Sequence, residues 1–370
     1  MARSIISAKK PCPERYALRL KRLRQKMKQR ELEGMFITHP PDQFYLCGFD
    51  ADDSWLLVTR RSVVAITDSR FERAVQDHCP HLRATVRTVS MYEALVPLIR
   101  RLNRIGIQAE HLSVRQKRQL SRKTKVPKIV ETHDWLLELR SVKDSSEIRR
   151  IRKTIAAQER ALEKTLGDLR VGMTERSAAG LLERHMRDMA ADGPSFASIV
   201  AVGPNSAKPH HRPGATRIRR NRPILIDFGA RTGGYCGDLT RVFSIGRLPR
   251  RIEKIYKIVE EAQAAAIEAI RPGVRYSDID HAARSIIEEA GFGPYFRHSI
   301  GHGLGLEVHE QPFLGKKARG SLDKNMVITI EPGIYLPGVG GVRLEDDLQV
   351  TARGHRRLSS LPTDLQSAII

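Results

Sequence analysis

Apolar residues in the first part of the chain recur at the spacings of helices and strands. Leu20, Leu23 and Met27 lie three and four residues apart, which predicts an amphipathic helix over residues 15–33. A second helix is predicted over residues 92–103. Short apolar runs predict strands at residues 34–38, 55–68 and 105–110, the second of them folded back around a basic turn. This alternation predicts a small α/β unit.

The pattern in the rest of the chain changes twice from helical to strand spacing. Residues 138–145 have the composition of a linker, and Asp144 with Glu147 three residues later predicts a capping box at a helix start. The later predicted elements are helix 174–191, strands 196–202, 224–229 and 235–245, helices 252–270 and 276–290, and a strand-rich end at 327–351. Helices followed by strands, twice over, is the order that a duplicated α+β domain would produce.

The length of the chain favours two domains. At 370 residues it exceeds the size of about 250–300 residues at which a single hydrophobic core stops growing. We therefore predict an α+β protein with domains at residues 1–140 and 141–370. The hydrophobic fraction of 41% is normal for a globular protein.

Net charge and cysteine usage limit the expected partners and the expected cellular compartment. The formal net charge is +22, and residues 15–30 contain eight basic residues and no acidic one. A nucleic-acid partner is therefore an open alternative, although a solvated helix face is the simpler interpretation. No apolar run reaches the roughly 18 residues of a membrane span, and residues 1–13 lack the pattern of a secretory signal. With four scattered cysteines, we expect a reduced, cytoplasmic protein without membrane contact.

Two acidic residues are candidates for metal binding in the middle of the chain. Asp227 ends an apolar strand-like run, and Asp238 follows eleven residues later, beyond the turn Thr232-Gly233-Gly234. A hairpin at this spacing would bring both carboxylates to one side. Acids at the ends of buried strands are costly unless they are paired or bind a metal.

Three more metal-type residues follow toward the C-terminus. His302 lies among glycines, which permit close backbone approach. Glu331 follows an apolar strand, and Glu345 lies fourteen residues later, again the length of a hairpin. Four carboxylates and one imidazole suit Mn²⁺, Co²⁺, Fe²⁺ or Zn²⁺. Four acids exceed the charge of one divalent ion, so two ions fit better.

Local sequences around these residues resemble those of a known family. The segments IDFGARTGGYCGDLTR, HSIGHGLGLEVHEQP, TIEPGIY and GVRLEDD resemble the signatures of the pita-bread metallopeptidases, which include aminopeptidase P, prolidase and methionine aminopeptidase, with creatinase as a metal-free relative. The resemblance extends from about residue 15. It implies a small creatinase-like N-terminal domain followed by a duplicated α+β, pita-bread catalytic domain.

The resemblance also implies roles for the five metal-type residues. Asp227 would bind one ion, Asp238 and Glu345 would bridge the pair, and His302 with Glu331 would complete the second ion. Glu331 would in addition carry a proton during catalysis. The cofactors expected are two divalent ions, Mn²⁺ first and Co²⁺, Zn²⁺ or Fe²⁺ as alternatives.

Further residues match substrate positions of the family. His210 and His309 would line the site and hydrogen-bond the reacting amide, and His298 would lie on the substrate side. Tyr335 resembles a pocket residue. Arg343 lies two residues before Glu345, so both side chains would share one face of a strand, where Arg343 could hold a carboxylate or a substrate terminus. No role is assigned to His211.

The activity implied is hydrolysis of Xaa-Pro peptide bonds with release of the N-terminal residue, by an Xaa-Pro aminopeptidase or dipeptidase. The family often forms homodimers, so a homodimer is expected. Two alternatives stay open: a non-catalytic nucleic-acid or protein-binding module, and a family member that acts on a non-peptide substrate.

Overall fold

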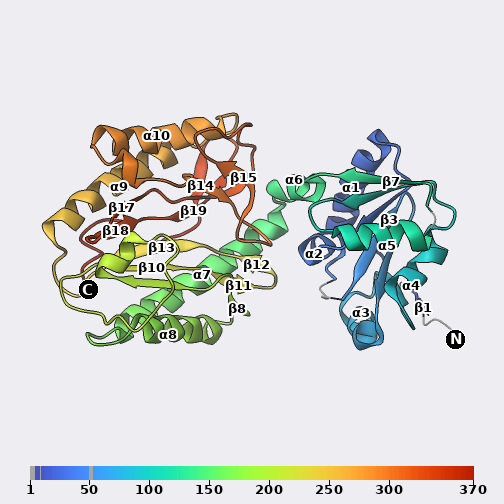
Figure 1. The fold of residues 1–370 in the computed structure, drawn as a ribbon, viewed down its shortest axis with the longest axis horizontal. Coiled ribbons are helices and arrows are strands. Elements are labelled where there is room, and N and C mark those ends of the chain that lie inside the picture. The colour runs from blue at the N-terminus through green and yellow to red at the C-terminus, as the bar shows by residue number, and fades with distance from the viewer. Residues whose placement is uncertain (1–4, 9, 50–52, 125) are drawn as a thin grey trace. The chain divides into compact units, whose positions relative to one another are not determined.

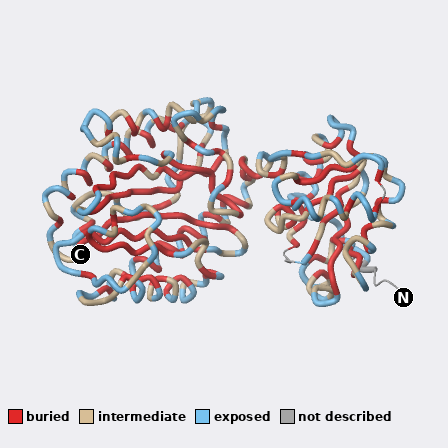
Figure 2. The backbone as a smooth tube through the Cα atoms, viewed as in Figure 1, coloured by how far each residue is buried: buried red, intermediate tan, exposed pale blue. Residues whose placement is uncertain are grey.

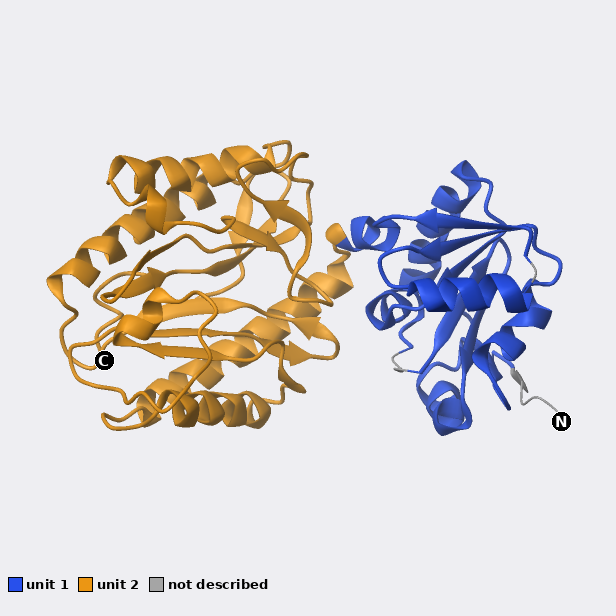
Figure 3. Cartoon of the chain, viewed as in Figure 1, with its two compact units in different colours: residues 1–140 blue, residues 141–370 orange. Residues whose placement is uncertain are grey.

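The structure is a computed structural model that describes residues 5–8, 10–49, 53–124 and 126–370. The chain divides into two compact units, Met1–Arg140 and Ser141–Ile370 (Figure 3). In each unit the buried backbone follows the strands, and exposed backbone follows the outer helices and loops (Figure 2). Part of the tract 1–13, in which no secretory signal is predicted, lies outside the described residues.

A mixed sheet forms the centre of the first unit, in the strand order β1-β5-β4-β3-β2-β6-β7. Its strands are β1 (Ile5–Ile6), β2 (Gly34–Ile37), β3 (Trp55–Thr59), β4 (Val63–Thr67), β5 (Arg83–Val86), β6 (Arg104–Gln108) and β7 (Lys128–Thr132). Its helices are α1 (Glu14–Gln29), α2 (Pro40–Cys47), α3 (Glu72–His78), α4 (Met91–Ile99), α5 (Val114–Thr124) and α6 (Trp135–Ser141), with the short 3₁₀ helix η1 (Ser69–Phe71). The predicted α/β unit is confirmed, including the hairpin of β3 and β4.

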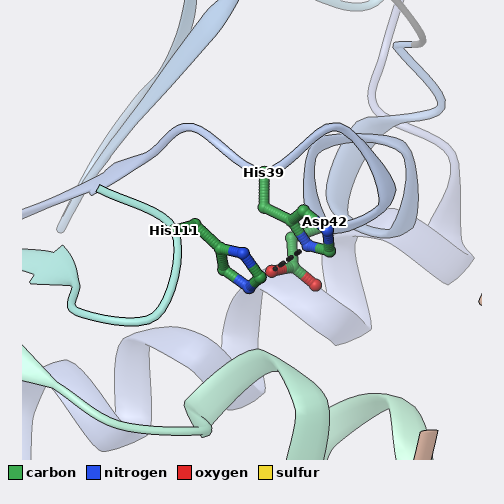
Figure 4. A group of neighbouring side chains, drawn as sticks. All are labelled: His39, Asp42 and His111. Atoms are coloured by element: carbon green, nitrogen blue, oxygen red, sulfur yellow. Dashed lines mark hydrogen bonds and ion pairs between the residues drawn. The ribbon is translucent and has the colours of Figure 1, made fainter. Parts of the chain in front are cut away.

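Three metal-type side chains meet in this unit, His39, Asp42 and His111 (Figure 4). Asp42 accepts hydrogen bonds from Arg140 at 2.8 Å and from Gln108 at 2.6 Å, and its Oδ2 lies 3.2 Å from His39 Nδ1. The two imidazoles stack, with ring centroids 3.7 Å apart and planes at 3°. Parallel rings direct their nitrogen lone pairs side by side, and the guanidinium already compensates the carboxylate. We therefore interpret the group as a hydrogen-bonded network.

The second unit contains several antiparallel sheets between two pairs of helices. Its strands are β8 (Gly193–Pro194), β9 (Ile199–Val202), β10 (Ile224–Phe228), β11 (Ala230–Thr232), β12 (Tyr235–Cys236), β13 (Leu239–Phe243), β14 (Gly301–Gly303), β15 (Glu310–Leu314), β16 (Val327–Ile330), β17 (Gly333–Leu336), β18 (Gly340–Arg343), β19 (Asp346–Val350) and β20 (His355–Arg357). Its helices are α7 (Ser145–Asp168), α8 (Glu175–Asp188), α9 (Arg250–Glu268) and α10 (Tyr276–Glu289), with the 3₁₀ helices η2 (Gly203–Ala207) and η3 (Gly293–Tyr295).

The two helix pairs lie on opposite sides of the strands (Figure 1). Helices α7 and α8 pack through Leu162 and Leu182 on Ile226 of β10. Ile255 of α9, Ile279 of α10 and Ile328 of β16 belong to a second buried cluster. Each helix pair therefore buries its own part of the strands, which confirms the predicted α+β architecture.

Two local predictions can be compared directly with the structure. The capping box at Asp144 is confirmed, because its side chain accepts from the backbone N–H of Glu147, and Glu147 returns a bond to the N–H of Asp144. The prediction of a linker over residues 138–145 is wrong in part, because α6 extends to Ser141. With only seven residues, α6 is too short to show a helical period in the sequence.

Among the described residues, the helices include none that is both long and apolar enough to cross a membrane.

Candidate metal centre

A hairpin brings Asp227 and Asp238 to one face. Strands β10 and β13 pair antiparallel with Asp227 opposite Thr240, and β11 and β12 continue the same register with Arg231 opposite Cys236. This register places Gly229 opposite Asp238. Since residues two apart on a strand share a face, the two carboxylates lie diagonally across the hairpin on the same side.

A second hairpin brings Glu331 and Glu345 together. Ile330 pairs with Asp346 where β16 meets β19, and Gly333 pairs with Arg343 where β17 meets β18. Both pairs have the same register, so Glu331 and Glu345 lie directly opposite one another between them. The spacing of fourteen residues in the sequence is therefore the spacing of a hairpin.

His302 joins the two pairs of acids from strand β14. Its Nε2 lies 3.4 Å from Glu331 Oε1 and 3.6 Å from Asp238 Oδ2. Its Nδ1 lies 3.1 Å from the carbonyl oxygen of Gly303, to which it donates. Burial, and then the neighbouring His309, lower the pKa of His302 to about 4, so the ring is neutral and Nε2 carries a lone pair. Asp238, His302 and Glu345 each offer one ligand atom, all within 4.8 Å of one another.

The charges in this cluster favour bound cations. Burial raises the pKa of Asp238 well above its usual range, and the nearby carboxylates of Glu345 and Asp227 raise it further. Burial and Glu331 likewise raise the pKa of Glu345, and burial raises that of Glu331 to about 7. Clustered carboxylates in a buried site repel one another unless positive charge compensates them. The oxygen-rich donor set, completed by a neutral imidazole, fits divalent metal ions.

Arg343 carries a fixed positive charge at the edge of the cluster. Its guanidinium donates to the Asp227 carboxylate, to Thr240 Oγ1 at 3.0 Å and to the Tyr335 hydroxyl at 2.7 Å. Thr240 links Arg343 to Glu345, because its hydroxyl donates to the Glu345 carboxylate at 2.7 Å. Arg343 therefore holds a carboxylate, which is one of the two roles that its strand position suggested.

The Tyr335 hydroxyl connects Arg343 to His298. It accepts from Arg343 and lies 3.0 Å from His298 Nε2, while His298 Nδ1 lies 2.9 Å from the carbonyl oxygen of Ser299. Burial lowers the pKa of His298 to about 4. A neutral His298 ring that donates from Nδ1 to the carbonyl oxygen accepts a hydrogen bond from the Tyr335 hydroxyl at Nε2. Tyr335 is thus buried support for His298, and its direct contact with a substrate stays a prediction.

The cluster forms one wall of a cavity of about 530 Å³. All five predicted metal ligands line it, together with the predicted substrate residues His210, His298, His309 and Arg343. His210 and His309 are exposed at its mouth, and His309 packs edge-on against His302 with ring centroids 4.4 Å apart. Apolar side chains that sequence reasoning did not identify also line it: Phe196, Ile199, Val308 and Phe313.

Other residues, to which sequence reasoning gave no role, hold the predicted ligands in place. The backbone N–H of His302 donates to Thr329 Oγ1 at 3.2 Å, and that of Asp238 donates to Asp347 at 3.4 Å. His211, which had no assigned role, lies 2.9 Å from the buried carboxylate of Glu175. A hydroxyl or carboxylate that supports a backbone amide has no distinctive sequence neighbourhood. Thr329 stood only as the first letter of the segment TIEPGIY. Asp347 stood only as the last letter of the segment GVRLEDD.

Comparisons with known proteins agree with this geometry. Residues 149–352 match the family model described as metallopeptidase family M24, and residues 19–142 match the creatinase/prolidase N-terminal domain. An uncharacterised peptidase of Staphylococcus haemolyticus is 34% identical over 355 residues, which cover 92% of this chain and 98% of that protein.

Solved structures are similar over nearly the whole chain. An Xaa-Pro dipeptidase from Bacillus anthracis superposes with a TM-score of 0.91 at 30% identity, covering 95% of this chain and 99% of that one. An X-Pro aminopeptidase from Thermotoga maritima gives a TM-score of 0.87 at 33% identity, covering 92% and 99%. A prolidase from Pyrococcus furiosus gives 0.86 at 32% identity, covering 91% and 99%. The chain belongs to metallopeptidase family M24, with a creatinase/prolidase N-terminal domain preceding its metallopeptidase domain.

Proposed function

We propose that this metallopeptidase hydrolyses Xaa-Pro peptide bonds at a centre of two divalent metal ions held by Asp227, Asp238, His302, Glu331 and Glu345. The observation that carries the proposal is the meeting of four carboxylates and one neutral imidazole on one wall of a cavity. The similar solved structures, a dipeptidase, an aminopeptidase and a prolidase, support the choice of bond. Mn²⁺ is the ion we expect first, and a homodimer is expected from the family resemblance.

The residues around the cavity suggest a division of labour. Divalent ions bound there would supply Lewis acidity and lower the pKa of water toward neutrality. Glu331, a carboxylate on the wall of the cavity, is suited to accept and return a proton during the reaction. His210 and His309, at the mouth, are suited to hydrogen-bond the carbonyl oxygen as it gains charge.

The form of the cavity suits a small substrate. Its volume of about 530 Å³ lies within the range of small-molecule sites, and Phe196, Ile199, Val308 and Phe313 give it an apolar side. A proline amide has no N–H, so it needs no acceptor from the enzyme at that atom. The apolar side is the surface on which we expect the proline ring to pack.

A matched panel of peptides tests the proposal. We expect metal-loaded protein to cleave Ala-Pro or Ala-Pro-Ala at least about 100-fold faster than Ala-Ala-Ala, which corresponds to a difference of about 2.7 kcal/mol in transition-state binding. The Asp238→Ala variant should cleave none of them. The ratio of dipeptide to tripeptide cleavage then decides between a dipeptidase and an aminopeptidase. Equal cleavage of all three peptides would contradict the proline specificity, and no cleavage by metal-loaded protein would favour a non-peptide substrate.

A further inference from the structure

The segment that carries His210 packs against β17 and β18 through η2, and His210 follows three residues after η2 ends. The segment leaves β9 through η2 and returns to β10 after residue 223. His210 itself is exposed, yet it lines the cavity together with Asp227, His298 and His309. The position of His210 at the cavity therefore depends on the contacts that hold the segment.

We propose that Glu175, at the start of α8, is a positioning residue that holds the segment 202–214, and with it His210, over the cavity. The proposal rests on the proposed function for its kinetic consequence, while its structural consequence stands independently. Glu175 is completely buried, with an exposed fraction of 0%. It acts through the segment and is not a catalytic residue.

The Glu175 carboxylate binds the segment at four points. Its Oε1 accepts from the backbone N–H of Val202 at 2.8 Å and from Asn205 Nδ2 at 2.9 Å. Its Oε2 accepts from the backbone N–H of Gly214 at 3.0 Å and lies 2.9 Å from His211 Nε2. These partners stand on both sides of His210 in the sequence, so one side chain fixes the two limbs of the segment that presents it.

The electrostatics of Glu175 agree with this role. Burial alone would raise the pKa of its carboxyl, but the hydrogen bonds from His211, Asn205 and the two backbone amides outweigh burial and lower it. The group is therefore an ionised carboxylate whose lone pairs are taken by donors. Hydrogen bonds to a buried ion are stronger than those between neutral groups, which suits a fixed anchor.

Other hydrogen bonds fix the two ends of the segment, so the middle of the segment is held by the Glu175 side chain. Glu175 N donates to Thr216 O at 2.9 Å, and Arg176 N donates to Gly214 O at 3.1 Å. On the other limb, the Ser206 hydroxyl accepts from Gly341 N of β18 at 2.8 Å. Residues 207–213 lie between these bonds, and the contact with Glu175 is made by His211, the residue next to His210.

The test is a double-mutant cycle with Glu175→Gln and His210→Ala. The amide of Gln is isosteric, but its NH₂ group would face donors at one of the two paired positions, so the segment would loosen. We expect Glu175→Gln to lower kcat/KM by about 10- to 100-fold, the loss typical of a shift of about 1 Å in a contacting group. In the His210→Ala background the same change should lower kcat/KM by less than about 3-fold, because the two residues act as one unit.

The matched control is Glu183→Gln, on the same helix two turns later, which should leave kcat/KM unchanged. Metal content should equal that of the wild type in all variants, since Glu175 contacts no metal ligand. Losses that simply multiply in the double variant would overturn the proposal. Should Glu175→Gln fail to fold, Asn205→Ala, which removes one of the four bonds, serves in the same cycle.

A second readout does not depend on the reaction. We expect Glu175→Gln to speed amide hydrogen exchange in residues 203–214 while exchange in β10 and β16 stays unchanged. Equal exchange in the segment would overturn the positioning role, whatever substrate the enzyme has. Faster exchange in a protein that cleaves no Xaa-Pro peptide would uphold the role of Glu175 and reject the proposed function, so the two failures are distinguishable.

Discussion

Individual side chains of the metal centre are linked by a chain of hydrogen bonds behind the ligands. Arg343 binds the Asp227 carboxylate and donates to Tyr335, whose hydroxyl meets His298 Nε2. In the other direction, Arg343 reaches Glu345 through Thr240. A single guanidinium thus supports predicted ligands from both hairpins and one substrate-side histidine. A substitution in this chain should therefore affect the other side chains that the chain connects.

Replacing Tyr335 by Phe tests this chain. The change removes one oxygen and leaves the Arg343 N–H and His298 Nε2 without that partner, while the ring volume stays the same. We expect the free energy of unfolding to fall by about 1–3 kcal/mol, the cost of unsatisfied buried polar groups. Urea denaturation measures it. An unchanged unfolding free energy would show that water replaces the hydroxyl and that the chain is not structurally important.

The five side chains that we propose as ligands could be selected from the sequence because each one carries its own local signal. Asp227 ends an apolar strand-like run, Glu331 directly follows another, and His302 stands among glycines. The residues that support these side chains could not be predicted in this way. Glu175 and His211 are 36 residues apart, and only the folded segment brings them into contact. Tyr335 looked like a pocket residue, since nothing in the sequence reveals the direction of its hydroxyl.

At the level of elements, the register of two hairpins determines the site. A shift of one residue in either hairpin would turn its carboxylates to the opposite face. The spacings of eleven and fourteen residues predicted hairpins, and both are present. Each hairpin is divided between two sheets. This division was not predictable, because it depends on strand twist and on packing against strands that are distant in the sequence.

A substitution at Gly301 tests how closely β14, the strand that carries His302, must approach β16. A Cβ atom at this position would lie 2.0 Å from the carbonyl oxygen of Thr329, so alanine would force β14 away from its neighbour and move His302. We expect Gly301→Ala to lower the unfolding free energy by about 1–3 kcal/mol and to weaken metal binding. Metal content measured after gel filtration, together with urea denaturation, checks both.

Gly180→Ala provides the control for that substitution. A Cβ atom there meets nothing within 4 Å, and the residue lies within α8. Alanine should stabilise the helix by up to about 1 kcal/mol and leave metal content unchanged. If both glycine variants behaved alike, the close approach of β14 would be irrelevant to the site.

For the whole molecule, the distribution of charge matters more than its sum. The net charge is +22, yet the buried centre collects carboxylates with raised pKa values. In the metal-free protein these groups bind protons more tightly when folded than when unfolded. Their contribution to stability is therefore present at low pH and is lost as pH rises through the folded pKa values. The sequence motifs predicted that these acids meet, but not that their pKa values are raised, because burial depends on the fold.

Metal and pH should consequently act together on thermal stability. Because ions require deprotonated ligands, we expect the rise in Tm on adding Mn²⁺ to grow between pH 5 and pH 7.5, where Glu331, with a pKa of about 7, loses its proton. Differential scanning fluorimetry with and without chelator measures the rise. The Asp238→Ala variant should show a smaller rise at every pH. A rise that shrank with increasing pH would contradict the account of the acids.

The most direct test of the metal centre is anomalous X-ray diffraction from crystals grown with Mn²⁺, recorded above and below its absorption edge. The account predicts two peaks in each chain, both enclosed by Asp227, Asp238, His302, Glu331 and Glu345, and their loss in crystals of Asp238→Ala. A single peak would reject the two-ion centre. Peaks elsewhere, or none at this cluster in a protein that binds the metal in solution, would contradict the assignment of these five side chains as ligands.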